Sequence, residues 1–185
     1  MSTQELWLII DKNSLFDSLQ AMRTRISIRE YRPSDKKSIV ALIQCLQDHV
    51  AMLDPLKLNK HGPAFLAAKY VEYLLDRVSK ENGAVFVAEH HGEMVGCIGG
   101  VVQEGPEDLE TYRTLNGRIM DLVVSPEHRG NALGKKLMLA MEQHFQKFHC
   151  RFTRVACFGY NRDAHRFYEK CGYHERSVEM MKELL

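Results

Sequence analysis

The stretch from Arg118 to Phe158 constrains the fold most tightly, because it is predicted to form a strand, a long helix and a second strand. Residues 118–124 are mostly apolar, and Ser125-Pro126 stops this strand. Apolar side chains recur at helical spacing from Leu133 to Phe148, and residues 155–158 form the second strand. A crossover helix returns the chain in the same direction, so the two strands are predicted to pair in parallel.

The elements on either side of this unit complete a layered domain. Before it, we expect a strand, two helices and an antiparallel hairpin with His91-Gly92 in its turn; after it, we expect a helix and a last strand. The expected ranges are 26–31, 39–50, 65–78, 84–89, 94–102, 161–170 and 174–181. Asn82-Gly83 ends the second helix, with the glycine expected at positive φ. The predicted class is α/β (α+β): a mixed, mostly antiparallel sheet of about six to seven strands flanked by about four helices.

Length and composition favour one ordinary domain. The chain has 185 residues, of which 1–24 are interpreted as an extension packed on a domain at 25–185. A formal net charge of +1 argues against a nucleic-acid or membrane-surface partner, and no apolar run approaches the length of a membrane span. The N-terminus lacks the features of a secretory signal. Five cysteines without a C-x-x-C pair predict reduced thiols in a cytoplasmic protein, with no disulfide framework and no metal site.

The turn between the strand at 118–124 and the long helix carries the chemistry. The first N–H groups of a helix lack intrahelical partners and carry partial positive charge, so they form an anion site. Gly130 leaves the backbone open to a ligand, and Arg129 and Lys135 add charge-assisted contacts to phosphate. The segment therefore predicts a ligand with two or more phosphates. The alternative is an ordinary strand-to-helix connection whose basic residues are solvated. Neither a P-loop nor a dinucleotide fingerprint is present.

Two blocks of sequence resemble the GNAT superfamily of N-acetyltransferases. Residues 129–134 are similar to the family's [Q/R]-x-x-G-x-[G/A] signature, with Ala132 in place of the middle glycine. This alanine fits without strain if its backbone is right-handed. Residues 161–173 are similar to the N-x-x-A-x-x-F-Y-x-x-x-G-[F/Y] block, in which Asn161 is expected to cap a helix. The resemblance covers about residues 26–181.

The resemblance implies an enzyme that transfers the acetyl group of acetyl-CoA to a primary amine by direct attack in a ternary complex. The acceptor, a small molecule or a peptide or protein amine, is not identified. By resemblance, the cofactor's pantetheine arm runs along a splayed gap between the fourth and fifth strands, and Tyr168 near the sulfur is the general acid for the departing thiolate. The residues that the resemblance assigns to cofactor binding are Leu122, Val123, Val124, Arg129, Gly130, Asn131, Ala132, Leu133, Gly134, Lys135 and Asn161.

The sequence does not identify the general base. Asp121 is the nearest acidic residue on the fourth strand, with a structural role as its alternative; many relatives place a glutamate where this chain has Met120. His49, Glu72 and a water chain are further options. Ala132 and the missing glutamate motivate a second hypothesis, a non-catalytic module that senses acyl-CoA. A homodimer is a reasonable expectation.

An acidic loop and a histidine pair can each be interpreted either as functional or as purely structural. The acidic loop could attract a cationic amine or be merely solvated; its acidic residues are Glu104, Glu107, Asp108 and Glu110. His90-His91 is interpreted as turn chemistry, because no third ligand stands at metal-site spacing.

Overall fold

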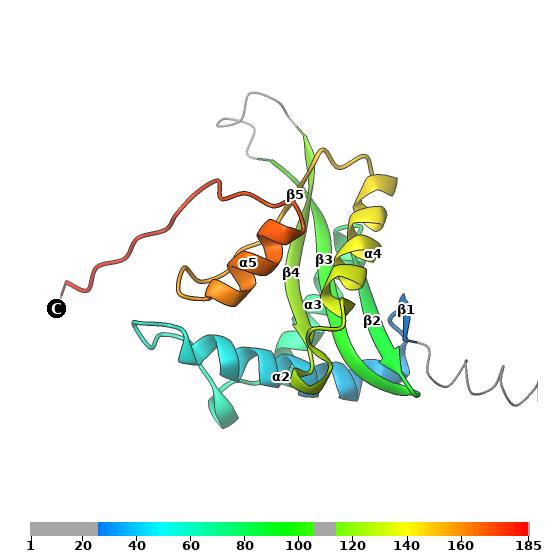
Figure 1. Ribbon diagram of the computed structural model, residues 1–185, viewed down its shortest axis with the longest axis horizontal. Helices are drawn as coiled ribbons and strands as arrows, with labels where there is room; N and C mark the ends of the chain where they lie inside the picture. Colours follow the sequence, from blue (N-terminus) through cyan, green and yellow to red (C-terminus); the bar gives the residue numbers. More distant parts are fainter. Residues whose placement is uncertain (1–25, 106–113, 185) are drawn as a thin grey trace, which may run out of the picture.

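The computed structural model of the chain describes residues 26–105 and 114–184. The expected N-terminal extension and three residues of the acidic loop, Glu107, Asp108 and Glu110, lie outside this part. The described strands form one sheet in the order β1-β2-β3-β4-β5. Their bounds are β1 Ser27–Glu30, β2 Ala84–His90, β3 Glu93–Glu104, β4 Leu115–Val124 and β5 Phe152–Arg154. The first three pairs are antiparallel and β4–β5 is parallel, which confirms the predicted mixed sheet (Figure 1).

Helices cover both faces of this sheet, which has five strands within the described residues rather than six or seven. α2 (Lys36–Met52) and α3 (Ala67–Lys80) pack on one face, where a core cluster joins Ile39, Ile43 and Val71 to the strands. α4 (Leu133–Lys147) packs on the other, and α5 (Arg162–Lys170) adds Phe167 and Tyr168 to the edge of that second cluster. The α helices of the described part number four, as predicted. Short 3-10 turns are η1 Pro33–Asp35, η2 Gly62–Ala64 and η3 Pro126–His128.

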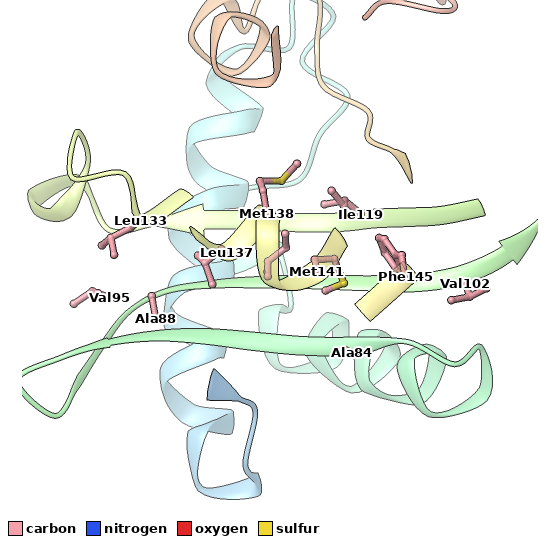
Figure 2. Packing of buried hydrophobic residues seen from close by; sticks show 11 residues of the cluster. Ala84, Ala88, Val95, Val102, Ile119, Leu133, Leu137, Met138, Met141 and Phe145 are labelled. Carbon is pink, nitrogen blue, oxygen red and sulfur yellow. The ribbon is translucent and has the colours of Figure 1, made fainter. Parts of the chain in front are cut away.

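The α4 face of the sheet is built around one aromatic ring. Phe145 is fully buried in one cluster with Leu137, Met138 and Met141 (Figure 2). A Cβ at Gly117 would collide with the Phe145 ring, and one at Gly100 would lie 2.8 Å from it. Two strand glycines therefore make the space that this ring fills, and interior packing density leaves no room for extra atoms there.

Two turns show where glycine is needed. His91 and Gly92 both have positive φ, 53° and 80°, as a tight two-residue hairpin turn requires. After α3, however, Asn82 takes the positive φ of 48°, not Gly83 as expected. Asparagine tolerates the left-handed region better than most residues. Gly83 is needed for a different reason: a Cβ there would collide with the carbonyl oxygen of Gly100 in β3.

The C-terminal third differs from the prediction in two places. The fifth strand is Phe152–Arg154, not 155–158, because the backbone N–H of Arg151 donates to Leu115 O and joins the chain to the start of β4 directly after the helix. No strand forms at 174–181 among the described residues; the sheet ends at β5 and this segment stays exposed, with Met180 90% accessible. A strand depends on pairing with a partner edge, and within the described residues this segment has none.

Candidate active site

β4 and β5 separate partway along β4. They pair only from Asn116↔Phe152 to Arg118↔Arg154, while β4 continues to Val124 (Figure 1). From residue 119 onward, no other described strand pairs with the β4 edge that faces away from β3. Backbone N–H and C=O groups at such an edge are free to bind the amides of an extended ligand. The structure therefore contains the splayed gap that the resemblance implied.

The three β4 residues expected to hold the ligand arm differ in side-chain direction. Leu122 and Val124 pack toward the core on the α4 face, whereas Val123 packs toward α2 and α3. These side chains are part of the hydrophobic core, so any contact with an arm in the gap comes from their backbone groups.

A β-bulge in β4 sets the direction of Asp121. Gly99 pairs with Asp121 and Gly100 with Ile119, so Met120 is the extra residue. Before the bulge, Ile119 packs toward α4; after it, Asp121 faces α3 on the opposite side of the sheet. A bulge shifts the alternation of side chains by one position. The bulge thus turns a carboxylate toward Tyr70.

Asp121 and Tyr70 form a half-buried, hydrogen-bonded pair. The Tyr70 hydroxyl lies 2.9 Å and 3.1 Å from the two carboxylate oxygens and donates to them. Burial raises the pKa of Asp121 to about 6, and the hydrogen bond from Tyr70 lowers it in part. Burial and the neighbouring charge of Asp121 raise the pKa of Tyr70 well above its usual value. A carboxyl with a pKa near 6 can take and release a proton close to neutral pH. Sequence reasoning missed Tyr70.

Tyr168 of α5 packs at the edge of the core cluster on the α4 side of the sheet. Its ring packs against Phe167 and Tyr173, with centroids 5.3 Å and 5.9 Å away. Burial raises the pKa of Tyr168 well above its usual value, and the charges of Cys157, Cys171 and Asp121 add to the shift. The phenol therefore keeps its proton at neutral pH. The structure brings the two predicted catalytic side chains, Tyr168 and Asp121, within electrostatic reach of each other.

The turn before α4 has the backbone of an anion cradle. Gly130 has φ of 80°, and the space where its Cβ would stand is open. Arg129 Nε donates to Val124 O at 3.2 Å, so this side chain folds back toward the end of β4. Leu133 is buried and offers only its backbone N–H. Exposed Asn131 and Lys135 flank the start of the helix.

Ala132 has a strained backbone. It is the N-cap residue of α4, with φ of 56° and ψ of 12°, and its side chain makes no capping bond. The condition under which an alanine fits here without strain, a right-handed backbone, is therefore not met. A left-handed conformation costs a residue with a Cβ roughly 1–2 kcal/mol.

We expect Ala132→Gly to stabilise the protein by about 1 kcal/mol, because glycine adopts positive φ freely and is preferred to alanine at an N-cap. The melting temperature should rise by about 2–4 °C in differential scanning calorimetry. Ala140→Gly, in the interior of α4, is the control and should lower it. A lower melting temperature for Ala132→Gly would contradict the assignment of strain.

Gly134 and Asn161 bring α4 and α5 together. A Cβ at Gly134 would lie 3.0 Å from the Phe167 ring, so this glycine permits close packing of the two helices. Asn161 Oδ1 accepts a hydrogen bond from the Ala164 backbone N–H at 3.1 Å, which confirms the predicted cap. Asp163, in the first turn of α5, has its pKa lowered mainly by the hydrogen bond from Arg166, and the charges of His49 and Arg129 contribute. The start of α5 therefore lies near the cradle.

His90, His128 and Ser125 form a network of side-chain contacts beside the cradle. The sequence indicated only a turn at His90-His91 and gave no sign of this network. His128 Nδ1 lies 2.9 Å from Ser125 Oγ, and its Nε2 lies 3.2 Å from His90 Nδ1. Burial and the charges of His91 and His128 lower the pKa of His90. The network ties the tip of the β2–β3 hairpin to the turn that follows β4.

Glu72, one of the options for the base, forms an exposed ion pair with Lys36 at 2.9 Å. Cys97 of β3 is buried; burial raises the pKa of its thiol, and the charge of Asp121 adds to the shift. Among the described residues, no group of three or more potential ligands is placed to hold a metal ion, and no helix is long and apolar enough to span a bilayer. A hollow of about 510 Å³ between β1 and α4 is lined by none of the predicted site residues.

Comparison with known proteins identifies the family. The model of the acetyltransferase (GNAT) family matches residues 52–173. The chain belongs to the GNAT family. The match includes β4, the cradle and α5, so the gap and the turn described above are elements of a GNAT domain.

Individual relatives agree with this assignment. The chain is 36% identical over 66 residues to glucosamine 6-phosphate N-acetyltransferase of Arabidopsis thaliana, covering 36% of this chain and 42% of that protein. It is 34% identical over 98 residues to aminoalkylphosphonate N-acetyltransferase of Salmonella typhimurium, covering 53% of this chain and 61% of that protein. The matches thus span less than two thirds of either relative. The BH1408 protein of Bacillus halodurans shares the fold, with a TM-score of 0.75 and 17% identity over 86% of this chain and 99% of its own.

Proposed function

We propose that this GNAT protein transfers the acetyl group of acetyl-CoA to a primary amine by direct attack in a ternary complex. The observation that carries the proposal is the unpaired edge of β4, which leads from the Asp121–Tyr70 pair to the cradle at Gly130. Two curated relatives are named as N-acetyltransferases, one for a sugar amine and one for aminoalkylphosphonates, which supports an amine acceptor.

The residues present suit coenzyme A. The open space at Gly130 and the first N–H groups of α4 suit a pyrophosphate, with Arg129, Asn131 and Lys135 around it. The β4 edge that faces away from β3 has no strand partner after Arg118 among the described residues; it runs along Leu122, Val123 and Val124 and suits the amide-containing pantetheine arm. A backbone N–H at this edge can also stabilise the oxyanion that develops on the acyl carbonyl.

Asp121 acts on the attacking amine, and Tyr168 acts on the leaving thiolate. The amine nitrogen forms a bond to the thioester carbonyl carbon, the carbon–sulfur bond breaks, and the second proton that the nitrogen must lose passes to the departing sulfur, which leaves as the thiol of coenzyme A. Asp121, with its pKa raised to about 6, accepts the proton that the ammonium must lose, and Tyr70 orients the carboxylate. Burial raises the pKa of Tyr168 above that of an ordinary thiol, about 8.5. Its phenol therefore donates a hydrogen bond to the departing thiolate more readily than a whole proton.

The proposal is tested by thiol release from acetyl-CoA over a panel of amines and peptides, together with the thermal shift that acetyl-CoA causes. Release with an acceptor and a higher melting temperature are the expected results, since a ligand that binds only the folded state stabilises it. Binding without release on any acceptor would indicate the acyl-CoA-sensing module instead. Absence of both would overturn the assignment of the cradle.

Tyr168→Phe should lower kcat about 10- to 100-fold, because it removes one hydrogen bond to a developing charge. The Kd for acetyl-CoA should stay nearly unchanged, since the phenol meets the sulfur mainly as it leaves. Tyr160→Phe, at an exposed tyrosine just before α5, is the matched control and should retain full activity. A Tyr168→Phe enzyme with wild-type kcat would remove the phenol from the mechanism.

A further inference from the structure

A second pocket opens beside the Asp121–Tyr70 pair. It has a volume of about 190 Å³ and lies between α3, β4 and the chain beyond β5. Its lining residues are Tyr70, Tyr73, Arg77, Arg118, Ile119, Met120 and Ala156. Tyr70 belongs to the pocket and also donates to Asp121, so the pocket adjoins the candidate base. An amine that occupied this pocket would approach the gap from the side of the sheet covered by α3.

The arginines of this pocket differ in how they are engaged. Arg77 donates from Nε and Nη2 to the two carboxylate oxygens of Glu81, both at 2.6 Å, so its charge is neutralised. The charge of Arg118 also acts on Glu81 and helps to lower the pKa of that carboxyl, although within residues 26–105 and 114–184 no hydrogen bond to the Arg118 guanidinium is formed. Arg77 and Arg118 thus share the single negative charge of Glu81, so this end of the pocket keeps one net positive charge.

The opposite end of the pocket is acidic. Tyr70 and Arg77 are seven residues apart on α3, which is about 10 Å along a helix. The carboxylate of Asp121 lies at the Tyr70 end, whereas Arg118 is close enough to Glu81, the partner of Arg77, for its charge to lower the pKa of that carboxyl. This polarity matches a small molecule with an amine and an anionic group less than about 10 Å apart. A lysine-rich peptide would instead bring like charge to Arg118.

We propose that the acceptor is a small amine with a second, anionic group, in which Arg118 holds a carboxylate, phosphate or phosphonate while the amine faces Asp121 and Tyr70. This inference rests on the proposed function and defines its substrate class. A guanidinium binds such groups through two parallel hydrogen bonds, which fixes orientation as well as affinity. With the anion held at Arg118, the amine is directed to the carboxylate that would deprotonate it.

The test compares matched acceptors in the thiol-release assay. O-phosphoethanolamine is paired with ethanolamine, and β-alanine with β-alaninamide, so each pair differs in the anionic group; a lysine-containing peptide represents macromolecular amines. In at least one pair, the wild-type kcat/KM should be at least about tenfold higher for the anionic acceptor than for its neutral partner. The pair that shows this preference identifies the anionic group. Arg118→Gln should abolish this preference mainly through KM, and Arg118→Lys should restore part of it. Lys80→Gln, at an exposed cation on α3, is the control and should change neither.

The possible outcomes separate this inference from the proposed function. Equal rates for charged and neutral members, acetylation of the peptide alone, or an equal loss for every acceptor in Arg118→Gln would overturn the substrate class while acetyl transfer stands. Acetyl-CoA binding with no acetylation of either anionic amine would also overturn it. Failure of acetyl-CoA to bind at all would reject the cofactor site, and with it both proposals.

Discussion

Asp121→Asn is expected to lower kcat by about 10²- to 10⁴-fold, the usual contribution of a positioned general base. The variant should fold normally, because the asparagine oxygen can still accept the hydrogen bond from Tyr70. Steady-state thiol release measures the loss. Asp76→Asn, at an exposed residue of α3, is the matched control and should keep wild-type turnover. An Asp121→Asn enzyme with more than about a tenth of wild-type activity would contradict the role of base.

The pH dependence gives an independent check on the same residue. Burial raises the pKa of Asp121 to about 6, so the carboxylate is protonated below that pH and cannot accept a proton. Wild-type kcat/KM should therefore fall as the pH drops through about 6, and Asp121→Asn should lack this inflection. The folded state binds this proton more tightly than the unfolded state, so the group makes the protein less stable as the pH rises from about 4 to 6. Replacement by asparagine should remove that loss, which leaves the variant as stable as the wild type or more stable at pH 7.

Phe145→Ala should destabilise the protein by about 3–5 kcal/mol, the largest effect that we expect on stability. The ring is 1% exposed and fills the space over Gly100 and Gly117, where the backbone of two adjacent strands limits collapse. Chemical denaturation measures the change. Leu139→Ala, on the exposed side of the same helix, is the control and should change stability by less than about 0.5 kcal/mol. A loss under about 1 kcal/mol for Phe145→Ala would mean that the core relaxes into the cavity.

Local sequence predicted most of the elements, because the signals that mark them act within a few residues. Helical spacing from Leu133 to Phe148 and the cap at Asn161 appear in the structure close to where they were expected. The parallel pairing of β4 and β5 followed from the crossover helix between them. The segment 174–181 shows the limit of such signals: a strand was expected there, but strand formation depends on a partner edge that local sequence does not specify.

The sequence by itself determined the order of elements, the glycine turn before α4 and the presence of Asp121 and Tyr168 in the chain. Only the tertiary structure decided what these groups face. The bulge at Met120 turns Asp121 toward Tyr70, and the same region places Arg118 in the pocket beside it. The physical reason is that a bulge is defined by the register of two strands distant in sequence, and one extra residue reverses every side chain that follows. The backbone strain at Ala132 likewise arises from how the chain must turn between β4 and α4.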